Sequence, residues 1–426
     1  MVLAHGIGGR QDLPIPMEFL LAGAALAVLI SFMALGFVWQ DSRFRADAGR
    51  RVPAWLEAFA GSRVTRAVLL LAGVLMTLAT AWAAALGPGG NANPAPWTIY
   101  ILFWVGIVPL SLLFGPVWKL LNPLRAVHKG IALLSGGRPL AALPSWIGYW
   151  PAAVGLFAFT WMELVPKNRI DGSVLLTWFA IYAAVTVVAS TVFGEEWFDK
   201  ADPFETYSGL LGRLAPIGRH PDGHLVFRNP FNGLAGTPEA PGLVAVVAVM
   251  LGSTAYDGFS RNPWWIDKVQ SGPLPRGLTS TLGLLALILL VALTYWLATR
   301  TMGRSGPMAL AHSLIPIAAG YVVAHYFTLL LSGGQQAVIL WSDPMGTGAD
   351  YFGTANLLPD NEILGNTTSA LLRAGAVILG HVLGVFAAHD RAITLLPRRH
   401  ALTGQLPLLL LMVFYTVGGL TLLFAA

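Results

Sequence analysis

Two histidines lie inside an apolar run of the sequence, AHSLIPIAAGYVVAHYF at residues 311–327. An imidazole in lipid loses the water that solvates it, so His312 and His325 are candidates for a function. The other ionisable side chains inside apolar runs are Glu163, Asp257, Arg373 and His381. Histidine and carboxylate side chains can together hold a divalent metal that activates water, or they can relay protons and bind a transported ion. For each residue taken singly, a structural hydrogen bond inside a helical bundle is the competing interpretation.

The spacing of the two histidines excludes a shared ion. Thirteen residues separate them, which corresponds to about 20 Å along a helix and to side-chain directions about 140° apart. Pro316 lies between them and can bend the helix, which changes this angle. We therefore expect His312 and His325 to belong to different sites. His325 and His381 would also suit the axial ligation of a haem, but no other feature of the sequence supports a haem.

A cluster of catalytic side chains is predicted near one face of the membrane. Glu163 and Asp257 are expected within about two helical turns of that face, and His325 about 9 Å below it. Tyr321 precedes His325 by four residues and shares its side of the helix. We predict Glu163, Asp257, Tyr321 and His325 as catalytic residues. A divalent metal such as Zn or Mn is one option, with Asp257, His325 and the deeper His381 as its ligands.

The elements that must position these side chains are membrane-spanning helices. The chain of 426 residues is 55% hydrophobic and 11% charged, whereas an ordinary soluble domain has about 25% charged residues. Ten apolar runs have the length of roughly 20 residues that a bilayer requires. They lie at 17–39, 66–86, 98–118, 146–166, 173–193, 241–260, 278–298, 307–331, 369–388 and 405–424. The predicted fold is an all-α, polytopic membrane bundle.

The basic residues predict the orientation of this bundle. With the amino terminus outside, nineteen Lys and Arg residues fall in cytoplasmic segments and six in outer segments. This asymmetry places both termini outside the cytoplasm. It also accounts for the net charge of +5, so no nucleic-acid partner is expected. Cysteine is absent, which excludes disulfides and thiolate ligands.

A short motif suggests an internal repeat. Gly-x-x-Trp occurs as GFVW at 36–39, GPVW at 115–118 and GEEW at 194–197, with 79 residues between successive copies. The second and third copies share a preceding Phe and a following Asx-Pro pair, which is a typical start for a helix. We predict a single transmembrane domain, in which 17–240 holds three two-helix repeats with interfacial cytoplasmic segments. The remainder, 241–426, carries the intramembrane histidines.

Two outer segments are candidates for completing the site. The eighth loop, predicted at 332–369, holds Asp343, Asp350, Asp360 and Glu362 and no basic residue. A loop of this length can act as a lid or supply ligands, although a solvated acidic loop explains it equally well. The segment AHGIGGRQDLPIP at 4–16 adds His5 and Asp12 on the same side.

Several long strings resemble one protein family. AHGIGGRQDLPIP, VFGEEWFDKADPFETYSGLLGRLAPIG, STAYDGFSRNPWW and AHSLIPIAAGYVVAHYF look like bacterial polytopic membrane proteins named fenitrothion hydrolase. The resemblance extends over nearly the whole chain and implies the bacterial cytoplasmic membrane as its location. It implies hydrolysis of an organophosphorus triester with release of an aryl alcohol such as a nitrophenol. It also suggests that activity depends on a second protein subunit.

Two classes of function follow from these observations. The first is a membrane-embedded, metal-assisted hydrolase of apolar esters, with an outward-facing site and an apolar substrate that arrives from the lipid bilayer. The alternative is a transporter or metal-handling protein, for which His381 and His312 would continue a polar path inward. A third reading is a structural subunit whose partner holds the chemistry.

Overall fold

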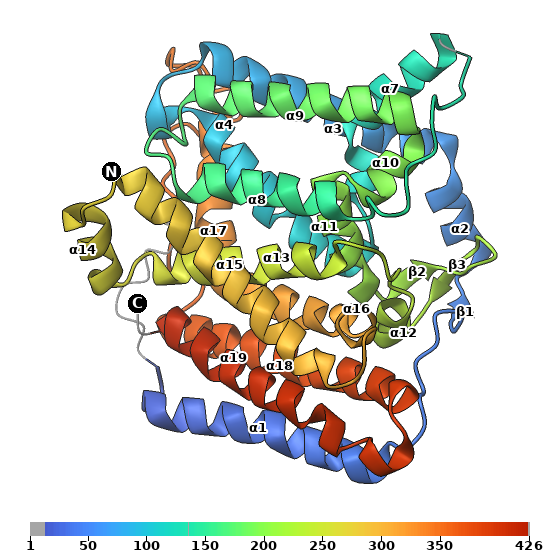
Figure 1. The fold of residues 1–426 in the computed structure, drawn as a ribbon. Coiled ribbons are helices and arrows are strands. Elements are labelled where there is room, and N and C mark those ends of the chain that lie inside the picture. Colours follow the sequence, from blue (N-terminus) through green and yellow to red (C-terminus); the bar gives the residue numbers. More distant parts are fainter. Residues whose placement is uncertain (1–12, 135, 425–426) are drawn as a thin grey trace.

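The chain folds into a bundle of helices. The computed structural model describes residues 13–134 and 136–424, and His5 and Asp12 lie outside the described residues. In Figure 1 the long helices lie side by side in one direction. The start of α1 and the end of α19 pack together through Leu20, Ala24, Leu420 and Leu423, so both lie at the same end of the bundle. We call this the α14 end and the opposite end, which carries a small sheet, the sheet end.

Eight of the described helical segments are long and apolar enough to cross a membrane. They are α1 (Met17–Val38), α3 (Arg63–Leu86), the composite segment Pro94–Phe114, α9 (Gly172–Phe193), α15 (Arg276–Arg300), the composite segment Gly306–Trp341, α18 (Asn366–Leu395) and the segment Thr403–Phe424 that contains α19 (Leu406–Phe424). Three of these segments are interrupted. Their parts are α4 (Pro94–Trp97), the π-helix η2 (Thr98–Val105), α5 (Ile107–Phe114), α16 (Gly306–Ala309), η4 (Ala311–Ser313), α17 (Leu314–Trp341) and η6 (Thr403–Gln405).

Two further helices lie along the same direction but are shorter. They are α8 (Trp150–Leu164), with 15 residues, and α13 (Leu243–Phe259), with 17 residues. α13 is followed by α14 (Pro263–Ser271) at an angle of 86°, and this bent pair counts as a ninth candidate span. The structure thus shows a helical bundle of the membrane type, while the number of ten spans stays a prediction.

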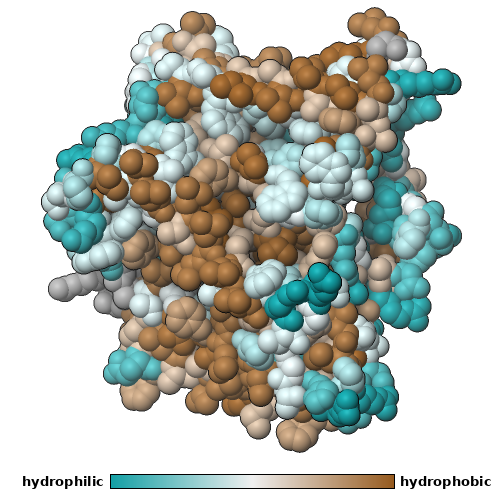
Figure 2. Space-filling view, in the orientation of Figure 1, coloured by the Kyte–Doolittle hydropathy of each residue, from teal (hydrophilic) through white to brown (hydrophobic). Residues whose placement is uncertain are grey.

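The surface of the bundle supports its placement in lipid. In Figure 2 hydrophobic side chains cover the middle of the molecule, and hydrophilic side chains gather at the two ends. Exposed apolar side chains on the outer helices include Phe19, Ile30, Leu289, Leu293 and Phe414. Soluble monomers rarely expose a continuous apolar surface of this extent.

Short elements close the two ends. At the sheet end these are α2 (Ala54–Gly61), α6 (Trp118–Leu121), α7 (Pro123–Leu134), α10 (Glu195–Lys200), α11 (Pro203–Leu211), η3 (Gly212–Leu214), α12 (Pro230–Ala235) and η5 (Arg398–His400); η1 (Gly90–Ala92) precedes α4. The sheet consists of β1 (Arg50–Arg51), β2 (Ile217–Arg219) and β3 (Leu225–Phe227). Its order is β1-β3-β2 and both pairs are antiparallel, so the loop after α1 is joined to the hairpin of β2 and β3.

The second and third Gly-x-x-Trp segments have similar backbones. Gly115 and Gly194 both end a helix with positive φ, 86° and 73°, which favours glycine because it lacks a Cβ. Asn122 and Asp202 then cap the helices α7 and α11, each followed by proline. The first copy differs, because α1 continues through Gly36 to Val38 without such a turn. The three-unit repeat stays a prediction.

The third segment is not a surface helix. All but one residue of α11 are buried, and Phe204 packs edge-on against Phe159, Trp178 and Tyr182. The expectation that this segment lies at the membrane interface is therefore wrong, because α11 is buried inside the bundle. The cause is the aromatic content of neighbouring helices, which offers α11 more apolar contact than a membrane surface does.

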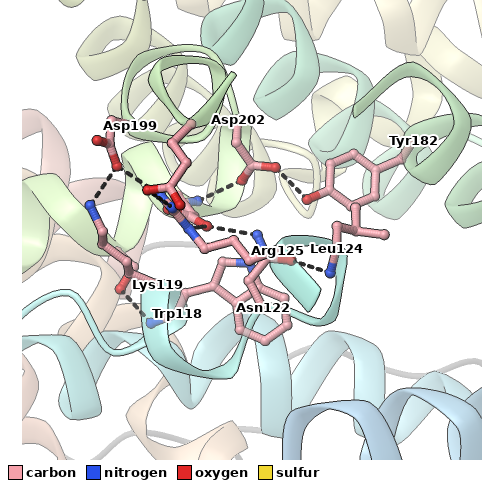
Figure 3. A network of polar contacts seen from close by, with 11 residues as sticks. Trp118, Lys119, Asn122, Leu124, Arg125, Tyr182, Asp199 and Asp202 are labelled. Atoms are coloured by element: carbon pink, nitrogen blue, oxygen red, sulfur yellow. Dashed lines mark hydrogen bonds and ion pairs between the residues drawn. The ribbon is translucent and has the colours of Figure 1, made fainter. Parts of the chain in front are cut away.

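An ion-pair network joins these two segments (Figure 3). Arg125 of α7 binds Glu205 of α11 through two bonds of 2.7 Å, and the two side chains are 7% and 3% exposed. Asn122 donates to Glu205 at 2.8 Å, and Asp199 accepts from Arg125 at 2.7 Å and from Lys119 at 2.6 Å. A bidentate, hydrogen-bonded pair of this kind neutralises both charges inside the bundle.

Removal of Arg125 is expected to destabilise the fold strongly. Arg125→Ala leaves the carboxylate of Glu205 buried and without its cation, which costs about 3–5 kcal/mol of unfolding free energy. The matched control is Lys119→Ala, since Lys119 and Asp199 are about half exposed; a loss of about 0–1 kcal/mol is expected there. Thermal or denaturant unfolding in detergent measures both, and equal losses would contradict this account of the network.

Candidate functional site

The centre of the candidate site is a pair formed by Asp257 and His325. Asp257 lies near the end of α13 and His325 in the middle of α17, and their side chains are each 4% exposed. Oδ2 of Asp257 lies 2.8 Å from Nε2 of His325. The carboxylate oxygen can only accept, so Nε2 carries a hydrogen and donates it; in the tautomer with its hydrogen on Nε2 the lone pair is on Nδ1. Nδ1 is buried and has no hydrogen-bond partner among the described residues.

Arg261 completes this pair with a positive charge. It follows Asp257 by one helical turn, and its Nη2 lies 3.3 Å and 3.4 Å from the two carboxylate oxygens and 3.4 Å from Nε2 of His325. The Arg261 side chain is 32% exposed, in contrast to its partners. It therefore connects the buried pair to the surface at the α14 end. The bend between α13 and α14, with Asn262 as the cap of α14, places Arg261 there.

Glu163 lies close to this cluster and is coupled electrostatically to Asp257. It is 2% exposed near the end of α8. Asp257, Arg169 and Trp104 are near enough to affect it electrostatically. Trp104 belongs to the π-helix η2, a rare conformation that is frequent at functional sites. Of the three ionisable groups predicted to converge from three helices, Asp257 and His325 are in direct contact and Glu163 lies near them.

Two tyrosines of α17 flank His325. The ring of Tyr321 stacks on the ring of His325, with 6.2 Å between the two ring centroids. The hydroxyl of Tyr321 is buried without a hydrogen-bond partner among the described residues. Tyr326 packs edge-on against His325 at 4.7 Å and is close enough to Asp257 to interact with its carboxylate. The predicted donor Tyr321 is therefore beside His325, and Tyr326 joins it.

His381 is not part of this cluster. Its Nδ1 bonds to the carbonyl of Val377 at 2.9 Å, and its buried Nε2 has no partner in the described part of the chain. Asp257, His325 and His381 do not form a group with ligand atoms within 4.8 Å of one another; among described residues only His220, Asp222 and His224 do. The metal assignment stays a prediction.

The remaining intramembrane groups have structural partners. Nδ1 of His312 lies 3.0 Å from the carbonyl of Ala309. Arg373 donates to the carbonyls of Ala324 and Leu423 at 3.0 Å and 3.2 Å. These contacts fit a hydrogen-bonding role within the bundle. His312 also lines a small polar cavity of about 110 Å³ near Asp390, at the sheet end.

The acidic loop is shorter than the sequence suggests, because α17 continues through Gly333 and Gly334 to Trp341. Two of the predicted lid acids bind their own segment. Asp343 accepts from the backbone of Thr347 and Gly348, and Asp350 accepts from Ser342.

Arg261 and Tyr326 were missed by the sequence analysis. The predicted span ended at residue 260, so Arg261 was counted as a loop residue that only sets orientation. Its spacing of four from Asp257 was the available signal, because residues at this distance face each other on a helix. Tyr326 carried no comparable signal.

Comparison with protein-family models, curated proteins and solved structures finds no match for the chain.

Removal of Asp257 is expected to destabilise the bundle. Asp257→Ala leaves the buried Nε2–H of His325 without its acceptor, which costs about 1–3 kcal/mol; Arg261 is 32% exposed, so water compensates most of its loss. Asp267→Ala in exposed α14 is the matched control, with a change of about 0.5 kcal/mol or less. Unfolding in detergent measures both variants. Similar stability of the two would show that the cluster is not a buried ion pair.

Proposed function

We propose that the protein is a membrane-embedded hydrolase of organophosphorus triesters or similar apolar esters. The observation that carries this proposal is the position of Nε2 of His325, 2.8 Å from the Asp257 carboxylate and 3.4 Å from the Arg261 guanidinium. An imidazole oriented by a carboxylate is suited to general-base catalysis, and a guanidinium is suited to phosphoryl oxygens. The resemblance to proteins named fenitrothion hydrolase supports the same reaction class.

In the proposed reaction Nδ1 of His325 accepts a proton from water. The resulting hydroxide attacks phosphorus, the bond from phosphorus to the aryl oxygen breaks, and the imidazolium returns the proton to the leaving aryl oxide. Asp257 stabilises the imidazolium, as the carboxylate of a catalytic triad does. Arg261 stabilises the negative charge that develops on the phosphoryl oxygen. Tyr321 and Glu163 border the site as a donor and as a second carboxyl.

A positive charge already occupies the place where a metal would act. The guanidinium of Arg261 lies within 3.4 Å of both predicted ligands, Asp257 and His325, and a metal ion there would meet its repulsion. In our proposal Arg261 therefore supplies the electrophilic assistance that the sequence analysis assigned to Zn or Mn. Treatment with a chelator separates the two versions of the mechanism.

The topology that we propose is that of the sequence analysis. It has ten spans, with α8 and α13 as the two short ones, and three repeated units at 17–240. It places the sheet end in the bacterial cytoplasm and the α14 end outside, because the cationic segments gather at the sheet end. The substrate then meets the site at Arg261 from the outer face. The side chains of Asp257 and His325 are nearly closed off, so access requires an opening of the α14 end.

Purified protein in detergent or liposomes is expected to release nitrophenol from an aryl phosphotriester. His325→Ala removes the base and is expected to lower kcat about 10²–10⁴-fold. His381→Ala is the matched control, because it removes a buried histidine of the neighbouring helix α18 and leaves Asp257 and Arg261 intact. Absorbance of the released nitrophenolate measures the rate.

Three outcomes decide this experiment. A large loss in His325→Ala with a small loss in His381→Ala supports the site. Equal activity of His325→Ala and wild type overturns it. Activity that a chelator abolishes in the wild type assigns the electrophile to a metal and not to Arg261.

Transport is the second candidate, and one observation favours it. His381 has a buried nitrogen with no hydrogen-bond partner among residues 13–134 and 136–424, and His312 borders a polar cavity at the sheet end, so polar groups occur at several depths. Such a series suits a proton or ion path. In proteoliposomes this reading predicts a proton or divalent-metal flux that His381→Ala abolishes. Flux without hydrolysis would replace the first proposal, and the absence of flux would remove the second.

A further inference from the structure

A tight hairpin at the sheet end holds two histidines and an aspartate. It has the sequence His-Pro-Asp-Gly-His at residues 220–224, between β2 and β3. The amide of His220 donates to the carbonyl of His224 at 2.9 Å, so the two histidines form the closing pair of the hairpin. Gly223, with φ of 94°, makes the turn that brings Asp222 over this pair. Residues that pair across a hairpin present their side chains on one face.

The surroundings of His220 define its protonation. Its Nε2 lies 3.0 Å from the backbone carbonyl of Asp47, and because a carbonyl only accepts, this nitrogen carries the hydrogen. The lone pair of a neutral ring is then on Nδ1, which accepts from the amide of Asp222 at 3.2 Å. The carboxylate Oδ2 of Asp222 also lies 3.2 Å from Nδ1. The imidazole lone pair and a carboxylate oxygen thus converge on one point, which a cation can occupy in place of the contact with the Asp222 amide.

His224 supplies the third donor. Its ring stacks on that of His220 with centroids 4.5 Å apart and an angle of 19°. One nitrogen of each histidine and one carboxylate oxygen of Asp222 all lie within 4.8 Å of one another. Ligands held at about 2.1 Å from a tetrahedral zinc ion are about 3.3 Å apart, so His220 and Asp222 already have this separation. The ligand nitrogen of His224 lies within 4.8 Å of both.

We propose that His220, Asp222 and His224 form a site for a divalent transition metal, of which Zn²⁺ is the best fit. Two imidazoles and one carboxylate form a donor set typical of zinc sites, whereas calcium and magnesium prefer oxygen ligands alone. The bond from His220 to the Asp47 carbonyl provides the outer contact that orients a metal-bound histidine. Water fills the open position of this half-exposed site.

Arg51 is a built-in competitor for the metal. Its Nη2 lies 3.4 Å from Nδ1 of His224, and a guanidinium only donates, so it binds the lone pair of that ring. Zinc can bind His224 only when this contact opens, since a neutral imidazole has a single lone pair. The positive charge of Arg51 also opposes a cation nearby. The proposal therefore predicts that loss of Arg51 tightens metal binding.

The ion would connect distant parts of the chain. Asp47 and Arg51 belong to the segment that follows α1, whereas the ligands belong to the hairpin after α11. Metal binding would thus reinforce the contact between β1 and β3 at the sheet end. The site lies at the opposite end of the bundle from Asp257 and His325, so its test is independent of the proposed hydrolysis.

Zinc titration of the full-length protein in detergent, without an affinity tag, tests the site. A competing chromophoric chelator reports the affinity, and elemental analysis reports the stoichiometry. One Zn²⁺ per chain is expected. His220→Ala and Asp222→Asn are expected to weaken binding about tenfold or more. His400→Ala, in an exposed turn that is not in the ligand group, is the matched control and should bind as wild type does.

The variant Arg51→Ala is expected to change zinc affinity in the opposite direction. Tighter zinc binding by this variant supports the competition with His224, and damage to the fold cannot imitate a gain of affinity. Absence of a zinc ion on the wild type, equal binding by wild type and His220→Ala, or weaker binding by Arg51→Ala would each overturn the proposal.

Discussion

The low dielectric of an apolar bundle requires every buried charge to find a partner on another element. Two ion-pair systems meet this requirement, and each holds together parts that are distant in the sequence. Asp257 with His325 and Arg261 joins α13 to α17 at the α14 end. Arg125 with Glu205 joins α7 to α11 near the sheet end. Pairing neutralises these charges, but desolvation offsets much of the Coulomb energy, so their main contribution is to fix which helices are neighbours.

The sequence was sufficient for features that depend on local periodicity. Apolar runs located the helices, although α17 and α18 extend 10 and 7 residues beyond the predicted ends at 331 and 388, since hydropathy and the helical rise are properties of a single segment. The same rise placed Asp257 and His325 at one level before any helix packing was known. Their direct bond confirms that they are neighbours. The depth of a residue along its helix can be computed from the sequence. In a bundle of roughly parallel helices, this depth is one of the three coordinates that define the position of a side chain.

The remaining coordinates depend on tertiary packing, and there sequence reasoning was less successful. His381 is expected below the cluster from its depth alone, and this stays a prediction, because its direction around α18 cannot be read from the chain. α11 has the pattern of a surface helix, yet aromatic rings of neighbouring helices bury it. The expectation that the chain has no His-x3-His pair is wrong, because His220 and His224 have this spacing, on a hairpin and not on a helix.

The position of Arg261 also bears on the choice between hydrolysis and ion transport at the Asp257 site. A site that coordinates a transported cation must offer its carboxylate to that ion, but here a guanidinium lies 3.3 Å from it and within a helical turn on the same chain segment. A cation would have to displace Arg261, whose positive charge repels it. An anionic or phosphoryl oxygen is instead attracted to the guanidinium, which is partly exposed and lies beside His325. The charge arrangement therefore favours chemistry on an oxygen-rich, electron-poor centre over passage of a metal ion, and any ion path would have to run through His381 instead.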